Sequence, residues 1–166
     1  MKKIFYIIIG LVLVCTVTSC KKKNKTREER IEEFRSMLTT ADTTQMLQLC
    51  DNAMELLKGK KIDEVIASLN EYNDSTQEVK PLSPLMEKRL KNQFRLFPVL
   101  DYRRVYFSFM LEGCNDVKYE VTFATAEQAG TEKAPVTSFM FNPVKKDGEW
   151  KLCVKTLNDK IDNSKN

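Results

Sequence analysis

Hydrophobic and polar positions follow two different periods along the chain, and the period changes near residue 100. Before that point apolar residues recur every three or four positions, which predicts helices over residues 42–58, 62–69 and 84–97. Beyond it apolar and polar residues alternate, which predicts four strands over residues 102–112, 117–125, 136–144 and 149–157. This order favours an α+β fold, with the helices packed on one face of a curved, cone-like, four-stranded antiparallel sheet.

Capping residues indicate where the helices begin and end. Ser83 followed by Pro84 is a strong start signal, Asp42 with Gln45 predicts another start, and Gly59 is a natural stop. The capping-box sequence TREE at residues 26–29 predicts a further short helix ahead of these three. Its apolar stripe is expected to pack on its own domain, although a membrane or a partner protein could also cover it. The stripe consists of Ile31, Phe34, Met37 and Leu38.

Alternation in the strand region predicts which face of the sheet the helices cover. Every second residue is apolar, and these side chains are expected to form a core. The predicted covered face consists of Val105, Phe107, Phe109, Leu111, Val117, Tyr119, Val121, Phe123, Phe139, Phe141, Trp150, Leu152 and Val154. The opposite face is expected to be exposed to solvent, and it carries Lys118, Glu120, Thr122, Lys151, Cys153 and Lys155.

The N-terminus has the pattern of a secretory signal. Two lysines at positions 2 and 3 precede 16 uncharged, mostly apolar residues, 4–19. As a helix this run would reach about 24 Å, which is shorter than the roughly 30 Å hydrocarbon core of a bilayer. Lysines 21, 22, 23 and 25 follow the run, an arrangement that fits a transmembrane segment poorly.

The last residues of this run, Val17-Thr18-Ser19-Cys20, resemble the lipobox of bacterial lipoproteins of the Bacteroidetes type. The resemblance implies cleavage before Cys20 and acylation of that residue, for example with palmitate, so that lipid chains anchor the protein. It also implies a periplasm-facing protein on the inner or outer membrane of a Gram-negative bacterium. Residues 1–19 would be the signal peptide, 20–41 a lipidated tether, 42–160 the domain and 161–166 a disordered tail. An ordinary cleaved signal and an uncleaved anchor are the alternatives.

Composition excludes several classes of chemistry. The 166-residue chain carries a net charge of +4 and contains no histidine, so Ser-His-Asp triads, Cys-His pairs and histidine-ligated metal sites are excluded. No glycine-rich phosphate loop and no aromatic-interleaved basic stripe is present, so neither a nucleotide cofactor nor nucleic acid is an expected ligand. No cofactor or metal is expected. Cys50, Cys114 and Cys153 lie too far apart in the predicted fold to form a disulfide.

The segment LLKGKKIDEVIASL and the closing DGEWKL, within an arrangement that spans residues 42–157, resemble the cone-shaped nuclear-transport-factor-2-like fold, which is related in shape to cystatin-like proteins. The resemblance implies a curved sheet around helices, often with a pocket between them. Some members are isomerases or dehydratases that use an aspartate with tyrosines, and many are binding domains. The candidate pocket-lining residues are Phe107, Phe109, Tyr119, Val121, Phe123, Phe139, Phe141, Trp150 and Leu152, with Asp101 and Arg103 at the mouth.

These observations predict a membrane-anchored, non-enzymatic binding or interaction module. Its expected partners are the membrane, through the lipid anchor, and a small hydrophobic ligand or an envelope protein. Two alternatives stay open. One is an anchored isomerase or dehydratase that uses Asp101, Arg103 and Tyr119. The other is an accessory subunit of an envelope complex that uses either the exposed sheet face around Lys118 and Glu120 or the tether helix. The sequence leaves the oligomeric state open.

Overall fold

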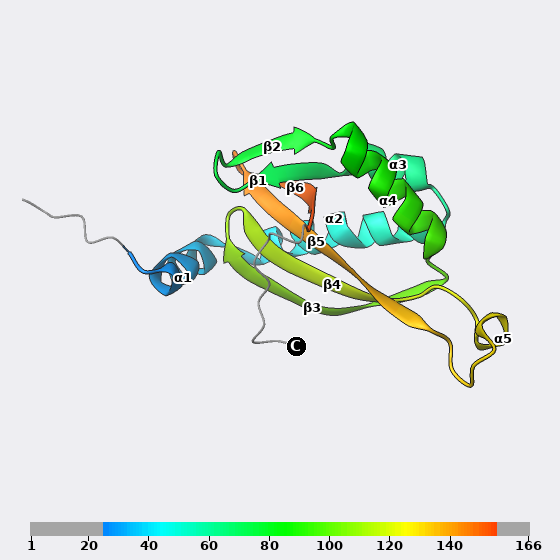
Figure 1. The fold of residues 1–166 in the computed structure, drawn as a ribbon. Helices are drawn as coiled ribbons and strands as arrows, with labels where there is room; N and C mark the ends of the chain where they lie inside the picture. The colour runs from blue at the N-terminus through cyan, green and yellow to red at the C-terminus, as the bar shows by residue number, and fades with distance from the viewer. Residues whose placement is uncertain (1–24, 156–166) are drawn as a thin grey trace, which may run out of the picture.

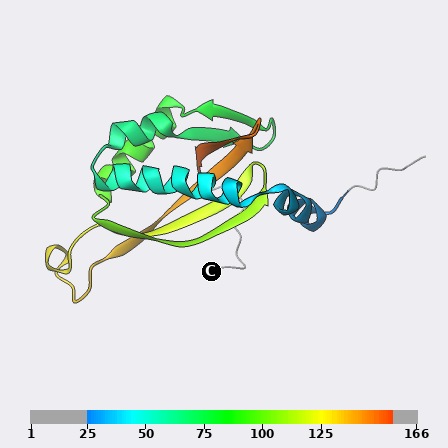
Figure 2. The ribbon, with the colours of Figure 1, turned by 180° about the vertical axis from the view of Figure 1, so that it is seen from behind.

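A computed structural model of the protein describes residues 25–155 and has an α+β architecture in which helices pack on one face of a sheet (Figures 1 and 2). The predicted α+β class is therefore confirmed. Among residues 25–155, no helix combines the length and the apolar character needed to cross a membrane. In chain order the elements are α1 (Arg27–Met37), α2 (Thr40–Lys58), α3 (Ile62–Ser68), β1 (Asn70–Asn73), β2 (Glu78–Pro81), α4 (Pro84–Leu96), β3 (Asp101–Leu111), β4 (Cys114–Thr122), α5 (Ala126–Ala129), β5 (Val136–Lys146) and β6 (Glu149–Val154).

The sheet has six strands in the order β2-β1-β6-β5-β4-β3, and β1 runs parallel to β6 while all other neighbours are antiparallel. The prediction of a four-stranded, purely antiparallel sheet is therefore wrong. The missed strands form a hairpin whose residues are mostly polar and half-buried or exposed, so they show no clear alternation. One residue pair, Asn70 with Cys153, joins this hairpin to the rest of the sheet.

Capping chemistry sets the helix starts. The Thr26 hydroxyl accepts a hydrogen bond from the Glu29 backbone N–H and the Glu29 carboxylate accepts one from Thr26 N–H, which confirms the predicted capping box of α1. Ser83 caps α4 as predicted. For α2 the predicted start at Asp42 is wrong, because Thr39 is the N-cap and Asp42 occupies the third helical position of a second capping box.

Asp42 also pairs with Lys145 of β5 and thereby links the start of α2 to the sheet. The hydrogen bond from Lys145, followed by that from Thr39 N–H, holds the pKa of Asp42 well below its usual value. A lowered pKa contributes stability above the unfolded-state value near 4, and this contribution is lost as the pH falls toward the folded-state value. Asp42→Asn should therefore lower the free energy of unfolding by about 1–2 kcal/mol at pH 7. Urea unfolding should show this difference shrinking below pH 4, and a pH-independent difference would contradict it.

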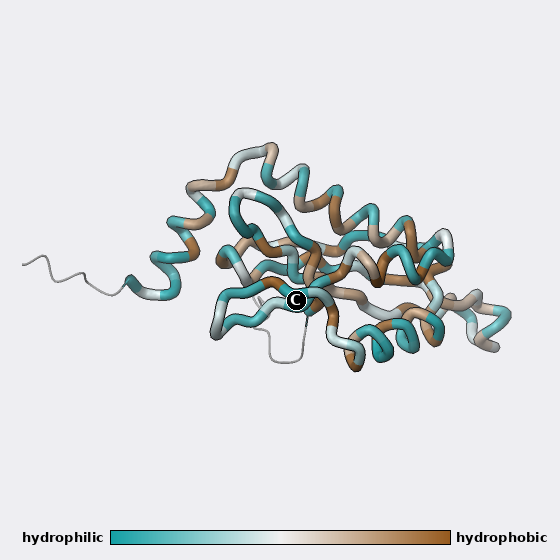
Figure 3. The backbone as a smooth tube through the Cα atoms, turned by 90° about the horizontal axis from the view of Figure 1, so that it is seen from above, coloured by the Kyte–Doolittle hydropathy of each residue, from teal (hydrophilic) through white to brown (hydrophobic). Residues whose placement is uncertain are grey.

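The face of the sheet under the helices is a filled core. Val117, Tyr119 and Val121 of β4 are fully buried, as the alternation predicts. Trp150 and Leu152 of β6 retain at most 8% of their surface. From α2, the buried side chains are Met46, Cys50, Ala53, Met54 and Leu57. Figure 3 shows hydrophobic and hydrophilic positions alternating along the helices that supply this apolar side.

A β-bulge changes the face that β3 presents to the helices. Arg104 lies opposite Tyr119 and Tyr106 lies opposite Lys118, so Val105 is the extra residue and is exposed rather than in the core. Before the bulge the even-numbered residues therefore face α2, and after it the odd-numbered ones do, starting with Phe107. The predicted face is correct at Phe107 and Phe109 and wrong before them. It is also wrong at Leu111, because a second register shift between Phe109 and Leu111 pairs Leu111 with Cys114 and leaves it outside the core. The β3–β4 turn also comes earlier than predicted, because β4 begins at Cys114.

The opposite face is not uniformly exposed, contrary to the prediction. Cys153, Val144 and Asp116 are at most 1% exposed although they point away from the helices. Asp116 forms an ion pair with Lys155, 2.6 Å from Oδ1 to Nζ, and both side chains are at least 95% buried. Lys118 and Glu120 are half-buried. This face therefore carries a buried charge pair as well as a polar surface.

The three cysteines of the described chain form no disulfide with one another, as predicted. Cys114 lies on β4 and Cys153 on β6, with β5 between them. Cys50 is buried on α2, and burial, together with the charge of Asp51, raises the pKa of its thiol well above the usual value. Cys50 is therefore a core residue rather than a nucleophile.

Candidate functional site

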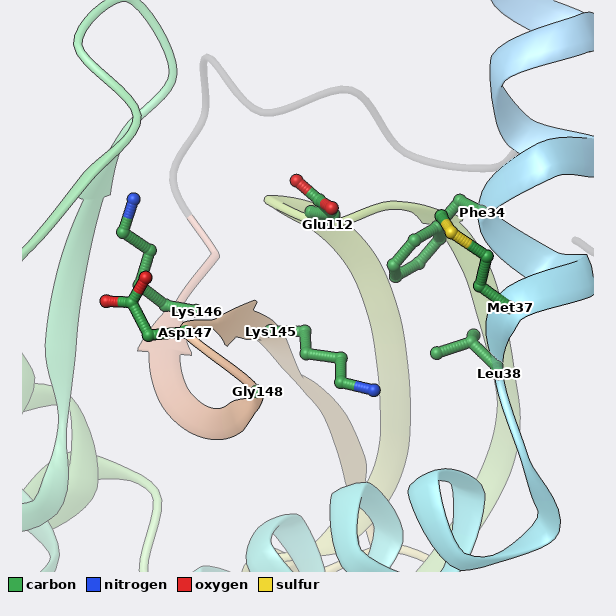
Figure 4. A pocket seen from close by; sticks show the side chains of 8 residues that line it. All are labelled: Phe34, Met37, Leu38, Glu112, Lys145, Lys146, Asp147 and Gly148. Carbon is green, nitrogen blue, oxygen red and sulfur yellow. The ribbon is translucent and has the colours of Figure 1, made fainter.

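A hollow of about 360 Å³ lies between α1 and the β5–β6 turn (Figure 4). Its volume is in the range of small-molecule sites, and it combines apolar and charged walls. The lining residues are Phe34, Met37, Leu38, Glu112, Lys145, Lys146, Asp147 and Gly148. The hollow is thus at the end of the domain where α1 enters.

The apolar wall comes from the last turn of α1 and the residue that follows it. Phe34 is buried and joins the main core, so it attaches α1 to the domain. Met37 is 59% exposed, and Leu38 leaves the helix in an extended conformation. Thr39, the N-cap of α2, directly follows Leu38. The connection between the two helices is therefore too short to reorient these side chains. In Figure 4 the three apolar side chains line one side of the hollow.

The charged wall comes from a two-residue hairpin loop. Asp147 has φ 51° and Gly148 has φ 84°, as a type I′ turn requires, and Lys146 pairs with Glu149 across the loop. Residues 145–148 thus form the tight hairpin that joins β5 to β6. Lys145 extends toward Leu38 in Figure 4, where its Nζ pairs with Asp42 and lies 6.0 Å from the Trp150 ring centre.

The rim of the hollow carries charges of both signs. Lys145 and Lys146 are its cations, Glu112 and Asp147 its acids, and Lys145 is paired with Asp42. A ligand anion at Lys145 would have to compete with Asp42, whereas an uncharged apolar group could contact the α1 wall directly. The hollow can therefore accommodate a small uncharged ligand whose apolar part contacts the α1 wall.

A second hollow of about 200 Å³ also borders α1 and shares Phe34, Met37 and Glu112 with the first. Its floor includes Tyr72 of β1 against Gly113 of the β3–β4 turn. A Cβ atom at Gly113 would lie 2.1 Å from Cζ and Oη of Tyr72, so a side chain has no room there. The turn therefore requires glycine because of this close approach.

Gly113→Ala should lower the free energy of unfolding by about 1–3 kcal/mol, because the methyl group must displace the Tyr72 ring. Tyr72→Ala removes the ring that the new methyl group would meet, so adding Gly113→Ala to Tyr72→Ala should cost less than Gly113→Ala costs in the unaltered protein. Chemical denaturation of the four proteins forms a double-mutant cycle. Additive losses would show that the ring is not the obstacle.

The structure places the residues predicted to line a pocket inside the packed core. Phe94 contacts Phe139 with ring centres 5.5 Å apart, and Phe109 lies 5.8 Å from Trp150. Phe97 packs edge-on against Phe123 at 5.1 Å. The other residues of the predicted set, Phe107, Tyr119, Val121, Phe141 and Leu152, belong to the same core or pack against it. None of the predicted set lines the two hollows described above.

The two residues predicted at the pocket mouth do not meet each other. Asp101 pairs with Lys58 at the end of α2, 3.0 Å apart, and this contact lowers the pKa of Asp101. Arg103 pairs with Glu120 on the face away from the helices, at 2.8 Å. The β3 bulge explains the difference, because it brings Tyr102 and Arg104 under α2 instead.

Sequence reasoning missed a polar cluster between α2 and β3. The Tyr119 hydroxyl donates to Asp51 Oδ1 at 2.6 Å, and Arg104 Nη1 donates to Asp51 Oδ2 at 2.8 Å. Tyr102 donates to Glu55 at 2.6 Å. Burial, then the bond to Asp51, raises the pKa of Tyr119 well above its usual value. The available signal was the spacing of Asp51 and Glu55, four apart beside the apolar stripe of α2.

Comparison with known proteins adds little. No protein-family model matches the chain, and no curated protein matches it. Among solved structures, it is similar to a Campylobacter jejuni protein provisionally described as an NTF2-like transpeptidase. The identity is 13%, the TM-score is 0.35, and the match covers 65% of this chain and 96% of the other. A likeness this distant carries nothing about activity.

Proposed function

We propose that the protein is a lipid-anchored, periplasm-facing binding module without catalytic activity, which takes a small apolar ligand in the hollow beside α1. The observation that carries this proposal is the location of the hollow, which lies beside α1 and not between the helices and the sheet. The core between helices and sheet is filled, and the 360 Å³ hollow lies beside the helix that follows the proposed anchor. We also propose that the domain is a member of the nuclear-transport-factor-2-like family and that the protein is a lipoprotein of the Bacteroidetes type.

The anchor follows from the residues around Cys20, which combine an apolar run, small residues and a thiol. Arg27, where α1 begins, comes seven positions after Cys20, and even a fully extended chain spans only about 24 Å between them. An acylated Cys20 would therefore keep α1 and its hollow close to the membrane surface. A ligand recruited there would come from the membrane or from the layer next to it.

Cys20→Ser should release the protein from the membrane fraction, because the serine oxygen cannot carry the thioether-linked lipid. Intact-mass analysis of the unaltered protein should show loss of residues 1–19 and the mass of the acyl groups. Cys15→Ser, inside the proposed signal, is the matched control and should leave both results unchanged. A full-length, unacylated chain would end the proposal of a lipoprotein.

Binding in the hollow can be measured with the uncharged dye N-phenyl-1-naphthylamine, whose fluorescence rises in apolar surroundings. Met37→Glu should weaken dye binding about tenfold, because it replaces an apolar contact with a charge. Met37 is largely exposed, so the fold should tolerate the change. Val136→Glu alters another exposed apolar residue outside the hollow and should bind as the unaltered protein does. Equal affinities for all three proteins would place the dye elsewhere.

An anchored isomerase or dehydratase is the second candidate, and the Asp51 cluster is the observation that favours it. A carboxylate beside two tyrosines is the arrangement such enzymes require. Two donors, Tyr119 and Arg104, already occupy this carboxylate, which argues against a free catalytic base. Asp51→Asn would abolish such an activity and leave dye binding beside α1 unchanged, so one variant separates the two functions.

A further inference from the structure

The outer surface of α4 is unusual for a helix of this domain. Leu85 is 80% exposed and Leu96 is 71% exposed, the two largest values among the exposed large hydrophobic residues of the described chain. They are eleven residues apart, which is about three helical turns, so they lie on the same side of the helix roughly 16 Å apart. The exposed residues on this side are Leu85, Lys88, Arg89, Asn92, Arg95 and Leu96, and we call them the α4 face.

The charge of the α4 face has one sign. Lys88, Arg89 and Arg95 are cationic, and none of its six residues is acidic. The acidic residue of α4, Glu87, lies on nearly the opposite side of the helix, where it pairs with Lys91 at 2.8 Å. Lys91 also pairs with Asp63 of α3 at 2.9 Å, so the neighbouring acids are matched by a lysine outside the face. The face thus combines three cations with an exposed leucine at each end.

We propose that the α4 face lies on an anionic membrane surface and is the second attachment point of the lipid-anchored protein. The inference rests on the proposed lipid anchor. A cationic helix face with protruding leucines complements anionic headgroups, since the cations bind phosphates while the leucines enter the boundary of the acyl layer. A membrane is favoured over an acidic protein because the proposed anchor keeps the start of α1 within about 24 Å of the headgroups, which raises the effective concentration of this surface for the whole domain.

The two attachment points lie at different corners of the molecule. In Figure 1, α1 leaves one end of the sheet, while α4 lies over the other half of the domain. A chain attached at both places would lie along the membrane rather than stand on its tether. Contact through the α4 face would therefore fix both the surface of the domain that touches the lipid and the orientation of the domain on the membrane.

Photocrosslinking tests the contact in the lipidated protein. Asn92→p-benzoylphenylalanine places a photoreactive group at the centre of the α4 face, and Asn52→p-benzoylphenylalanine places it on the exposed side of α2 as the matched control. Each variant is reconstituted into vesicles of phosphatidylcholine, with or without phosphatidylglycerol, and irradiated. Mass spectrometry should find phospholipid adducts at position 92 in the anionic vesicles, and at least tenfold fewer at position 52.

Charge reversal supplies the second readout. Each cation near an anionic surface strengthens binding by about fivefold, so Lys88→Glu with Arg89→Glu should reduce the adduct at position 92 more than tenfold. Equal adducts at positions 92 and 52, or insensitivity to charge reversal, would overturn the inference. So would irradiation in cells that joins position 92 to a protein instead of lipid. Intact mass of the same preparation reports acylation of Cys20 separately, so failure of the anchor is distinguished from failure of the α4 contact.

Discussion

Asp116→Ala is expected to lower the free energy of unfolding by about 3–5 kcal/mol, although Asp116 lies in none of the hollows and outside the apolar core. The reason is the Lys155 ammonium, whose Nζ lies 2.6 Å from the Asp116 carboxylate where both side chains are almost completely buried. Removing the carboxylate deprives this buried ammonium of the opposite charge 2.6 Å away, which offsets its lost hydration. Urea unfolding followed by circular dichroism measures the change.

Two further variants test whether the loss arises from the unpaired buried charge. Adding Lys155→Met to Asp116→Ala removes the second charge as well and should recover most of the loss, since an apolar replacement of a buried ion pair is often close to neutral. Glu149→Ala breaks the exposed pair with Lys151 on the same sheet, whose separation is also 2.6 Å, and should cost less than about 1 kcal/mol. A loss below 1 kcal/mol for Asp116→Ala would show that water reaches Lys155.

The elements with strong local signals were predictable. The caps of α1 and α4 and the type I′ turn at Asp147-Gly148 are short-range chemistry, written in a few adjacent residues. The alternation on β4 and β6 was equally clear, because one face of each strand is buried against helices. Local pattern and tertiary structure agree in these segments, so sequence reasoning was sufficient.

The β1–β2 hairpin and the bulge of β3 were not predictable in the same way. The hairpin is half-exposed and polar, and it is held by its single residue pair with β6, a contact distant in sequence. The bulge at Val105 leaves no mark in the alternation, yet it reverses the face of every residue before it. Because of this reversal the candidate mouth residues Asp101 and Arg103 point elsewhere, and Arg104 joins Asp51.

The hollow beside α1 could not be predicted from the sequence either. Its walls come from the end of α1 and from a turn more than 100 residues later, and their proximity depends on where α1 docks. Sequence periodicity located Phe34 and Met37 on one stripe, but it could not show that one is buried while the other lines empty space. Empty space is a property of packing between elements, and periodicity reports only the character of each element.

Leu152→Ala is expected to lower the free energy of unfolding by about 2–5 kcal/mol, and this result bears on function as well as on stability. Leu152 is 2% exposed in the core between the sheet and α2, where truncation leaves a cavity. If this layer instead held an open ligand pocket, the side chain would already border a void and its loss would cost little. The size of the loss therefore distinguishes a filled core from a pocket.

Leu96→Ala is the matched control, because the same side chain is truncated where it is 71% exposed. Its effect on unfolding should stay within about 0.5 kcal/mol. If both leucine variants lost less than 1 kcal/mol, the layer under the helices would be loosely packed, and the predicted set from Phe107 to Leu152 would return as the better candidate for a ligand site. A large loss confined to Leu152 would exclude an open pocket in this layer and so favour a ligand site outside it, as proposed beside α1.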